Sequence, residues 1–260
     1  MIVAVDIGNS HIVLGCMDGA SVRCIKRFLT ASTFSVRACR AAMKAVLSAD
    51  KAACGPFEGA VISSVVPSVT ETVKEAVHQL TGRRALVIGP DTDKGIDIVT
   101  DDPRHLAADL VAGAVGALLT LAPPVIVIDM GTATTLTVVN GKGQLQGVVI
   151  MPGPDLSLKA LADGAALLPR VFPEAPPRCI ASNTTDSMKS GVIFGTAAAL
   201  DGMTDRIEAE LGEQAHVIAT GGLASVVIPH CRRKIALDDA LLLRGLAAIY
   251  NVNREKTGLV

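Results

Sequence analysis

The stretch VIVIDMGTATTLTVVNGKG, residues 125–143, contains the pattern that decides the fold. An apolar run ends on Asp129, one apolar residue follows, and Gly131 leads through small and hydroxylated residues into a second apolar run. Short apolar runs bounded by glycine turns are typical of buried strands. The stretch therefore predicts a strand, a tight turn and a returning strand, with a carboxylate where the first strand ends.

The same pattern opens the chain, in MIVAVDIGNSHIVLGCMDG, residues 1–19. Asp6 and Gly8 take the places of Asp129 and Gly131, and a second turn follows at Asp18–Gly19. A single Asp-x-Gly is a common turn, but two copies in equivalent hairpins, nearly half the chain apart, indicate an internal repeat. We therefore predict two related lobes, residues 1–122 and 123–260, with the boundary at Pro123–Pro124.

Strands and helices alternate along the rest of the chain. Helices are expected at 33–48, with Ser32 or Thr33 as the cap, and at 67–80, 105–120, 154–163, 184–211 and 239–249. Further strands are expected near 21–28 and at GAVISSVV, ALVIG, LQGVVI and HVIAT, with a turn at Asn140–Gly141. Alternation of this kind predicts an α/β fold.

Composition excludes several classes of protein. Half of the 260 residues are hydrophobic and 19% are charged, so a packed core is expected. The net charge of −1 provides no basic field for nucleic acid, and Trp is absent as a stacking platform. No apolar run reaches the length of a membrane span, and no charged leader precedes the first strand. We expect a cytoplasmic protein that binds neither nucleic acid nor membrane.

Cysteine and histidine provide no metal or disulfide pattern. None of the six cysteines forms a CxxC pair, and the five histidines are scattered. Reduced core thiols are therefore the expected state.

The two hairpin turns have the chemistry of a phosphate site. Glycine lets the backbone approach a ligand closely, and exposed N–H groups of a turn bind anions. The polar side chains that could assist are Asn9, Ser10, Thr132, Thr134 and Thr135. Asp6 and Asp129 would repel a phosphate unless a cation lay between, and Mg²⁺ binds in this way through carboxylate, water and phosphate oxygens. The pattern predicts a nucleoside triphosphate in a cleft between the two lobes.

A third glycine turn follows the strand HVIAT. Thr220, Gly221 and Gly222 join that strand to a helix start, where N–H groups suit an anion. Neither a Walker A sequence nor a G-x-G-x-x-G after a strand is present, so the ordinary nucleotide loops are not available. The three glycine turns together favour the cleft interpretation.

The order of motifs resembles the type III pantothenate kinases over essentially the whole chain. The matching segments are DIGNS (6–10), ISSVVP (62–67), DDP and AADL (101–110), DMGTATT (129–135), MPGPDLSLKAL (151–161), LLPRV (167–171), NTTDSMKSG (183–191) and TGG (220–222). The resemblance implies two ribonuclease H-like lobes of the actin-like ATPase and sugar-kinase superfamily. It also implies a homodimer that phosphorylates pantothenate in the first step of coenzyme A synthesis, using ATP, Mg²⁺ and a monovalent cation such as K⁺ or NH₄⁺.

The resemblance also implies roles for individual residues. Asp6 and Asp129 would serve the metal, and Asp109 would be the general base for the pantothenate hydroxyl. The phosphates or nucleotide would be bound by Gly8, Asn9, Ser10, Gly131, Thr132, Thr134, Thr220, Gly221 and Gly222. The acceptor would be bound near Ala107, Ala108, Leu110 and Ala165.

The acceptor positions depart from the family pattern. Leu110 replaces the Arg that binds the pantothenate carboxylate in the family, Ala107 replaces a Gly, and Ala165 replaces a substrate-contacting Thr. A charge-assisted contact of this kind contributes ~1.5–3 kcal/mol. Three interpretations follow: pantothenate is held otherwise, by Arg104 or His105; the acceptor is a different, less acidic molecule; or the chain is a non-catalytic, complementary or regulatory subunit that pairs with a related chain in a heterodimer.

Overall fold

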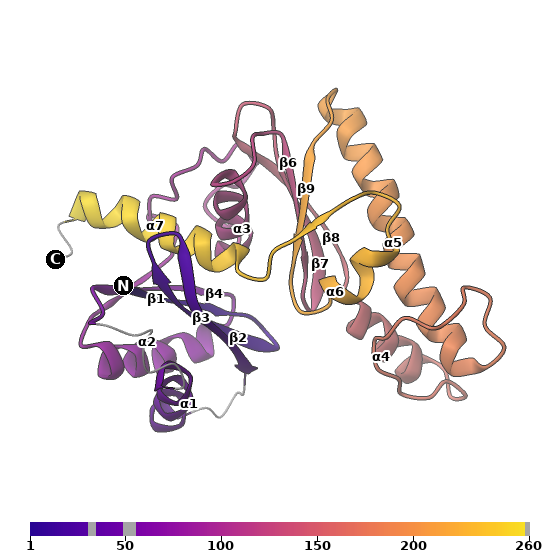
Figure 1. The fold of residues 1–260 in the computed structure, drawn as a ribbon, viewed down its shortest axis with the longest axis horizontal. Helices are drawn as coiled ribbons and strands as arrows, with labels where there is room; N and C mark the ends of the chain where they lie inside the picture. Colours follow the sequence, from indigo (N-terminus) through magenta and orange to yellow (C-terminus); the bar gives the residue numbers. More distant parts are fainter. Residues whose placement is uncertain (31–34, 49–55, 258–260) are drawn as a thin grey trace. The chain divides into compact units, whose positions relative to one another are not determined.

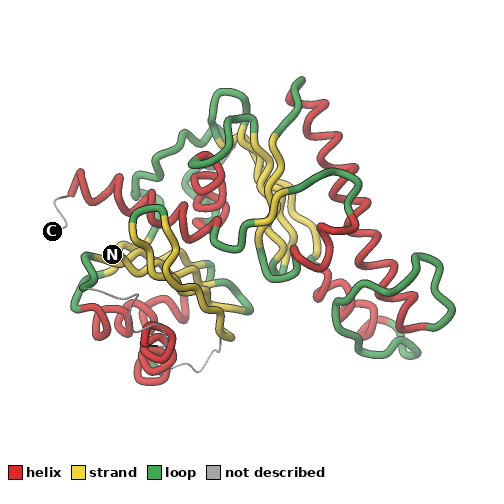
Figure 2. Tube along the Cα trace, viewed as in Figure 1, coloured by secondary structure: helices red, strands yellow, loops and turns green. Residues whose placement is uncertain are grey.

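The computed structural model describes residues 1–30, 35–48 and 56–257, which form two compact units. Unit 1 comprises the described residues up to Thr120 together with the C-terminal segment from Ala240, and unit 2 comprises Leu121–Asp239. Each unit has a sheet with helices packed on it (Figures 1 and 2). The predicted α/β class is confirmed.

Unit 1 is built on a five-stranded sheet in the order β3-β2-β1-β4-β5. Strand β1 is antiparallel to β2 and parallel to β4, as in the sheet of a ribonuclease H-like lobe. The elements of this unit are β1 (Ile2–Ile7), β2 (His11–Asp18), β3 (Ser21–Leu29), α1 (Val36–Ser48), β4 (Gly59–Ser64), α2 (Pro67–Thr81), β5 (Ala85–Val87), α3 (Ala108–Leu118) and α7 (Leu241–Thr257).

Unit 2 repeats this topology. Its five strands lie in the order β10-β9-β6-β7-β8, and β6 is antiparallel to β7 and parallel to β9. Strand β6 thus corresponds to β1, and the predicted internal repeat is confirmed. The elements are β6 (Val125–Met130), β7 (Ala133–Val139), β8 (Leu145–Pro152), α4 (Pro154–Gly164), α5 (Thr184–Leu211), β9 (His216–Thr220), α6 (Ala224–Val227), η1 (Ile228–His230) and β10 (Ala236–Leu237).

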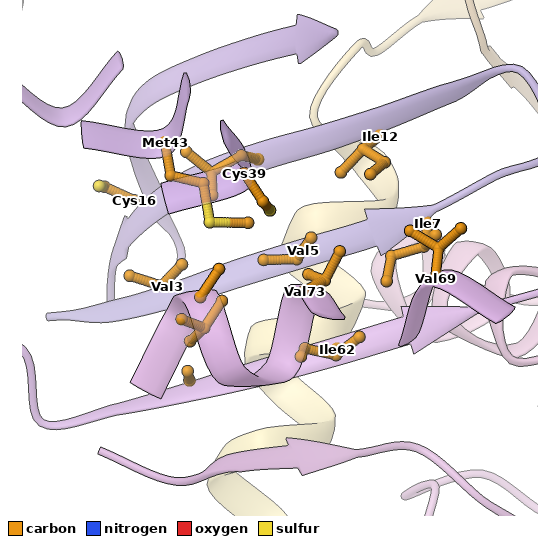
Figure 3. Close-up of a cluster of buried hydrophobic side chains, with 14 residues drawn as sticks. Val3, Val5, Ile7, Ile12, Cys16, Cys39, Met43, Ile62, Val69 and Val73 are labelled. Carbon is orange, nitrogen blue, oxygen red and sulfur yellow. The ribbon is translucent and has the colours of Figure 1, made fainter. Parts of the chain in front are cut away.

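Alternation along β1 separates two faces of the sheet in unit 1. Val3, Val5 and Ile7 point into a buried cluster with side chains of α1 and α2, among them Met43 and Val73 (Figure 3). The residues between them, including Asp6, face the other side, against which α7 packs. Unit 2 has the same arrangement, because Ile126, Ile128 and Met130 pack against α5 and α6 whereas Asp129 faces the opposite side.

The C-terminal helix corrects the predicted assignment of residues 123–260 to one continuous lobe. Helix α7 belongs to unit 1, where it contacts β1, β2 and β4 and packs along α3. Two glycines make this packing possible: a Cβ at Gly245 would overlap the carbonyl of Ala112, and one at Gly116 would overlap the carbonyl of Leu241. Small residues let helix backbones approach closely. The predicted boundary assumed that each lobe is one continuous segment, so it did not anticipate that the chain returns to unit 1 after unit 2.

Several boundaries also differ from the expected ones. Helix α3 begins at Ala108 rather than 105, and α7 extends to Thr257. The expected caps of α1, Ser32 and Thr33, lie outside the described residues, while the Ser35 hydroxyl accepts a hydrogen bond from the Ala38 N–H at 3.2 Å. The elements α6, η1 and β10 are too short to be predicted from periodicity.

The turn between β7 and β8 is longer than the expected Asn140–Gly141 turn. The Asn140 side-chain oxygen accepts hydrogen bonds from the N–H groups of Lys142 and Gln144 at 3.0 and 3.1 Å. Gly143, with a φ of 75°, carries the left-handed conformation. The Asn side chain therefore organises a wider loop.

Two expectations from composition concern cysteines and membrane helices. The described cysteines are free thiols, and Cys54 lies outside the described residues. Within the described ranges, no helix has both the length and the apolar character needed to cross a membrane.

Candidate active site

The first candidate element is the turn between β1 and β2. Gly8 donates its N–H to the His11 carbonyl at 2.9 Å, and its own carbonyl accepts the Thr30 hydroxyl at 2.8 Å. The Thr30 N–H also donates to the Ser10 carbonyl at 2.9 Å. These hydrogen bonds hold the backbone of the turn in place, and Asn9 and Ser10 stay exposed to solvent. The predicted phosphate-binding residues of unit 1 therefore share one ordered, open turn next to Asp6.

The second candidate element is the turn between β6 and β7. Asp129 is the fifth residue of β6, as Asp6 is of β1. Gly131 donates its N–H to the Ala133 carbonyl at 3.0 Å, and Gly153 donates to the Thr132 carbonyl at 3.1 Å. A Cβ at Gly153 would stand 2.5 Å from the Gly131 carbonyl oxygen, so the start of α4 lies directly against this turn. Gly131 and Thr132 remain exposed.

The third glycine turn lies against Asp129. Thr220 is the register partner of Asp129 in the parallel strand β9. Gly221 has a φ of 96°, and a Cβ there would stand 2.5 Å from the Asp129 Oδ1 and 2.6 Å from the Met130 nitrogen. Only glycine fits this conformation and this space. The structure thus brings Asp129, Gly131, Thr220 and Gly221 together at one end of the unit 2 sheet, with Gly222 next in the chain.

Thr134 does not share that site. Its side chain is fully buried, and it pairs with Met130, which faces α5. Thr134 was expected to bind phosphate, but alternation along β7 places it on the covered face of the sheet. Thr135, the register partner of Asp129, lies on the side of the carboxylate instead. Successive side chains of a strand point to opposite faces of the sheet. Following this alternation from Asp129 through the turn would have separated Thr134 from Thr135 in the sequence.

Asp109 lies in the first turn of α3, in unit 1. Its Oδ1 accepts a hydrogen bond from the Leu110 N–H at 2.8 Å. Burial raises the pKa of the Asp109 carboxyl, and hydrogen bonds from the Leu110 and Asp109 N–H groups oppose this shift without cancelling it. A partly desolvated carboxylate with a raised pKa is a better proton acceptor than an exposed one.

The predicted acceptor residues divide between the two units. Ala107 is the N-cap of α3, and Ala108 and Leu110 follow it in unit 1, whereas Ala165 caps the C-terminus of α4 in unit 2. The side chains of all four are apolar. The two alternative cations have local partners: Arg104 bonds Asp91 at 2.8 Å, and His105 contacts Asp102 at 2.8 Å.

The donor set fits a hydrated divalent cation better than a metal held by protein alone. Among the residues that the structure describes, no three His, Cys, Asp or Glu side chains gather to hold a metal. Mg²⁺ in nucleotide sites uses one or two carboxylates and completes its shell with water and phosphate oxygens. Asp6 and Asp129, each beside an open glycine turn, are suitable ligands of this kind.

Comparison with known proteins identifies the family. The family model for type III pantothenate kinase matches residues 2–206. The chain belongs to the type III pantothenate kinase family. The type III pantothenate kinase of Rubrobacter xylanophilus is 37% identical over 262 residues, which cover 98% of this chain and 99% of that relative. The type III pantothenate kinase of Exiguobacterium sp. is 36% identical, with 98% and 100% covered.

Solved structures agree on the fold. A Baf family protein from Campylobacter jejuni superimposes with a TM-score of 0.60 at 17% identity, over 97% of this chain and 99% of that one. Component A of the Acidaminococcus fermentans (R)-2-hydroxyglutaryl-CoA dehydratase gives a TM-score of 0.56 at 14% identity, with 96% of each chain covered. These matches confirm the expected actin-like ATPase fold for this type III pantothenate kinase family member.

Proposed function

We propose that the chain transfers the γ-phosphoryl group of ATP to pantothenate, giving 4′-phosphopantothenate and ADP. The observation that carries this proposal is the repeated hairpin, in which an aspartate at the same strand position precedes an open glycine turn in each unit. The relatives named type III pantothenate kinase match the chain over 98% of its length, which supports pantothenate as the acceptor.

The residues have separate roles in this reaction. Backbone N–H groups and side chains of the turns at Gly8–Ser10 and Gly131–Thr132 bind phosphate oxygens, and Thr220–Gly222 support the nucleotide. Asp6 in unit 1 and Asp129 in unit 2 each offer a carboxylate to Mg²⁺, which would neutralise charge on the phosphates when bound. Asp109 accepts the proton of the pantothenate hydroxyl as the new O–P bond forms and the bond to the ADP oxygen breaks. Orientation by the turns supplies most of the rate.

The residues that we propose to contact the acceptor lack the guanidinium of the family pattern. Leu110 and the alanines at 107, 108 and 165 offer apolar contacts, and Arg104 and His105 are already engaged with carboxylates. We therefore expect pantothenate to bind weakly, and Leu110→Arg with Ala165→Thr to improve kcat/KM about tenfold for each ~1.4 kcal/mol recovered.

The remaining features of the proposal concern assembly and surroundings. We infer a monovalent cation, K⁺ or NH₄⁺, at the phosphates, a dimeric protein and a cytoplasmic location. The family pattern supports the cation. Exposed apolar side chains of unit 2, such as Leu167 and Phe172, support the dimer.

Calorimetry and product analysis test the proposal. The purified chain should bind ATP only with Mg²⁺, and Asp6→Asn should weaken that binding at least tenfold. Mass spectrometry should detect 4′-phosphopantothenate with the unmodified chain. ATP binding of equal strength without metal would remove the role of Asp6. A failure to phosphorylate pantothenate, even with Leu110→Arg and Ala165→Thr, would refute the acceptor.

A further inference from the structure

Two buried hydroxyl groups belong to register partners of Asp6 and Asp129, and neither has a hydrogen-bond partner among the described residues. The Ser63 side chain in β4 is fully buried, and its hydroxyl has no hydrogen-bond partner among the described residues. The hydroxyl of Thr135 in β7 is likewise buried without a partner in that part of the chain. Leaving a buried hydroxyl unpaired is unfavourable, so each of these two positions calls for an explanation.

Register connects each hydroxyl with one aspartate. Ser63 pairs with Asp6 across the parallel strands β1 and β4. Thr135 pairs with Asp129 across the antiparallel strands β6 and β7. Paired residues of neighbouring strands project to the same face of a sheet, with their Cβ atoms about 5 Å apart. Each hydroxyl is therefore a direct cross-strand neighbour of a carboxylate.

The packing on the other face supports this placement. Ala60 and Ile62 of β4 lie with Val5 and Ile7 in the cluster against α1 and α2, so alternation along β4 places Ser63 on the opposite face. In unit 2, Leu136 and Val138 of β7 pack with Ile128 on the α5 face, so alternation along β7 places Thr135 on the opposite face. Ser63 and Thr135 thus share the faces of Asp6 and Asp129.

We propose that Ser63 and Thr135 are positioning residues that orient the carboxylates of Asp6 and Asp129, and the water molecules bound to them, when Mg·ATP occupies the site. This inference deepens the proposed function and rests on it. A hydroxyl both donates and accepts, so it can bridge a carboxylate oxygen and a metal-bound water. Among the described residues neither hydroxyl has a hydrogen-bond partner, and the ligand with its hydration shell would supply one.

The stability of the free protein distinguishes this role from a structural one. If Ser63 serves only the ligand, Ser63→Ala removes an unpaired buried group, and the Tm of the free protein stays the same or rises. The Tm increase caused by Mg·ATP should shrink, and the Kd for Mg·ATP should rise about tenfold. Without Mg²⁺, ATP should change the Tm of neither form, because the hydroxyl acts through the carboxylate and its hydrated cation.

Thr135 offers the cleaner pair of variants. Thr135→Val keeps the shape and removes the hydroxyl, whereas Thr135→Ser keeps the hydroxyl and removes a methyl group. Weak binding by the Val form and near-normal binding by the Ser form are expected. Thr204→Val is the matched control, because the Thr204 hydroxyl is also buried and unpartnered among the described residues but belongs to α5, which packs on the face of the unit 2 sheet opposite Asp129. Its Mg·ATP binding should be unchanged.

The outcomes separate this inference from the proposed function. Unaltered Mg·ATP binding in Ser63→Ala and Thr135→Val, with an active unmodified chain, overturns the positioning role and leaves the kinase proposal intact. A lower Tm of the free protein in both variants, with weakened binding to match, also overturns it in favour of a structural role. If Ser63→Ala fails to fold, the Thr135 pair decides. An unmodified chain that binds no Mg·ATP refutes the proposed function itself.

Discussion

The partly buried carboxyl of Asp109, which we propose as the general base, also affects the stability of the folded protein. Because burial raises its pKa in the folded protein, ionising this carboxyl is harder in the folded than in the unfolded chain. Its contribution to stability is therefore complete below the pKa of the unfolded chain, and it is lost as the pH rises through the folded pKa. Burial therefore makes ionisation of this carboxyl unfavourable, and the same shift favours the proton-acceptor role that we propose for it.

Asp109→Asn should consequently separate stability from activity. We expect kcat with pantothenate to fall by about 10²–10⁴, with Mg·ATP binding kept. Relative to the unmodified protein, the free energy of unfolding of the variant should increase from acid to neutral pH. Urea titrations across that range and steady-state kinetics measure the two effects.

Asp97→Asn, at an exposed position outside the candidate site, is the control and should change neither quantity. The acid limb of the kcat profile should also lie at a higher pH than an ordinary aspartate would give. A variant with normal turnover would remove Asp109 from the base role.

Some residues of the candidate site could be predicted from the sequence, and others could not. Asp6, Gly8, Asp129 and Gly131 follow a pattern that repeats in the chain, so their place at the turns could be predicted. Ser63 could not be assigned to Asp6, because that neighbour is set by the register between strands far apart in sequence. The pKa shift of Asp109 depends on burial, which no local pattern encodes.

At the scale of single elements, the close packing of helices α3 and α7 depends on glycine residues where they cross. A Cβ at Gly245 would overlap the Ala112 carbonyl and lie 2.9 Å from the Gly116 nitrogen. In a helix interior, glycine is otherwise less favourable than alanine by about 1 kcal/mol. Close approach of the two backbones therefore explains a residue that helix propensity disfavours.

Gly245→Ala should destabilise the protein by about 1–3 kcal/mol, since the helices must separate to admit the methyl group. Gly191→Ala in α5 is the matched control: nothing lies within 4 Å of its Cβ position. That substitution should be neutral or stabilising by up to about 1 kcal/mol. Denaturant unfolding compares the two, and equal effects would contradict the packing explanation.

Helix positions were largely predictable because their apolar periodicity is local, whereas their partners were not. The segment 105–120 is rich in small apolar residues, a composition that by itself would fit a surface shared between protomers. In the structure α7 covers α3 within unit 1, and residues 111–117 are buried there. The small apolar residues of α3 are thus explained by packing against α7 within the same chain.

At the scale of the whole molecule, unit 2 exposes large apolar side chains that the described part of the chain leaves largely uncovered. Leu167, Phe172 and Ile180 are 93%, 85% and 88% exposed in the segment between α4 and α5. Large exposed apolar side chains that gather in one segment mark interaction surfaces. We expect a second copy of this chain to cover them.

Light scattering at micromolar concentration should therefore give the mass of a dimer. Phe172→Asp with Leu167→Asp should produce a monomer that is still folded, because neither side chain contributes to a core. Val99→Asp, at a 49% exposed apolar position of unit 1, should leave the dimer intact. A monomeric unmodified protein, unchanged by Mg·ATP, would refute the assembly.

The return of α7 to unit 1 affects the order in which the chain acquires structure during synthesis. The ribosome makes the strands of unit 1 first, but the helix that packs against one face of their sheet follows the whole of unit 2 in the sequence. Unit 2 is continuous and can fold as it emerges, as domains generally do. Until α7 is made, the part of the N-terminal sheet that α7 covers in the finished protein therefore stays exposed.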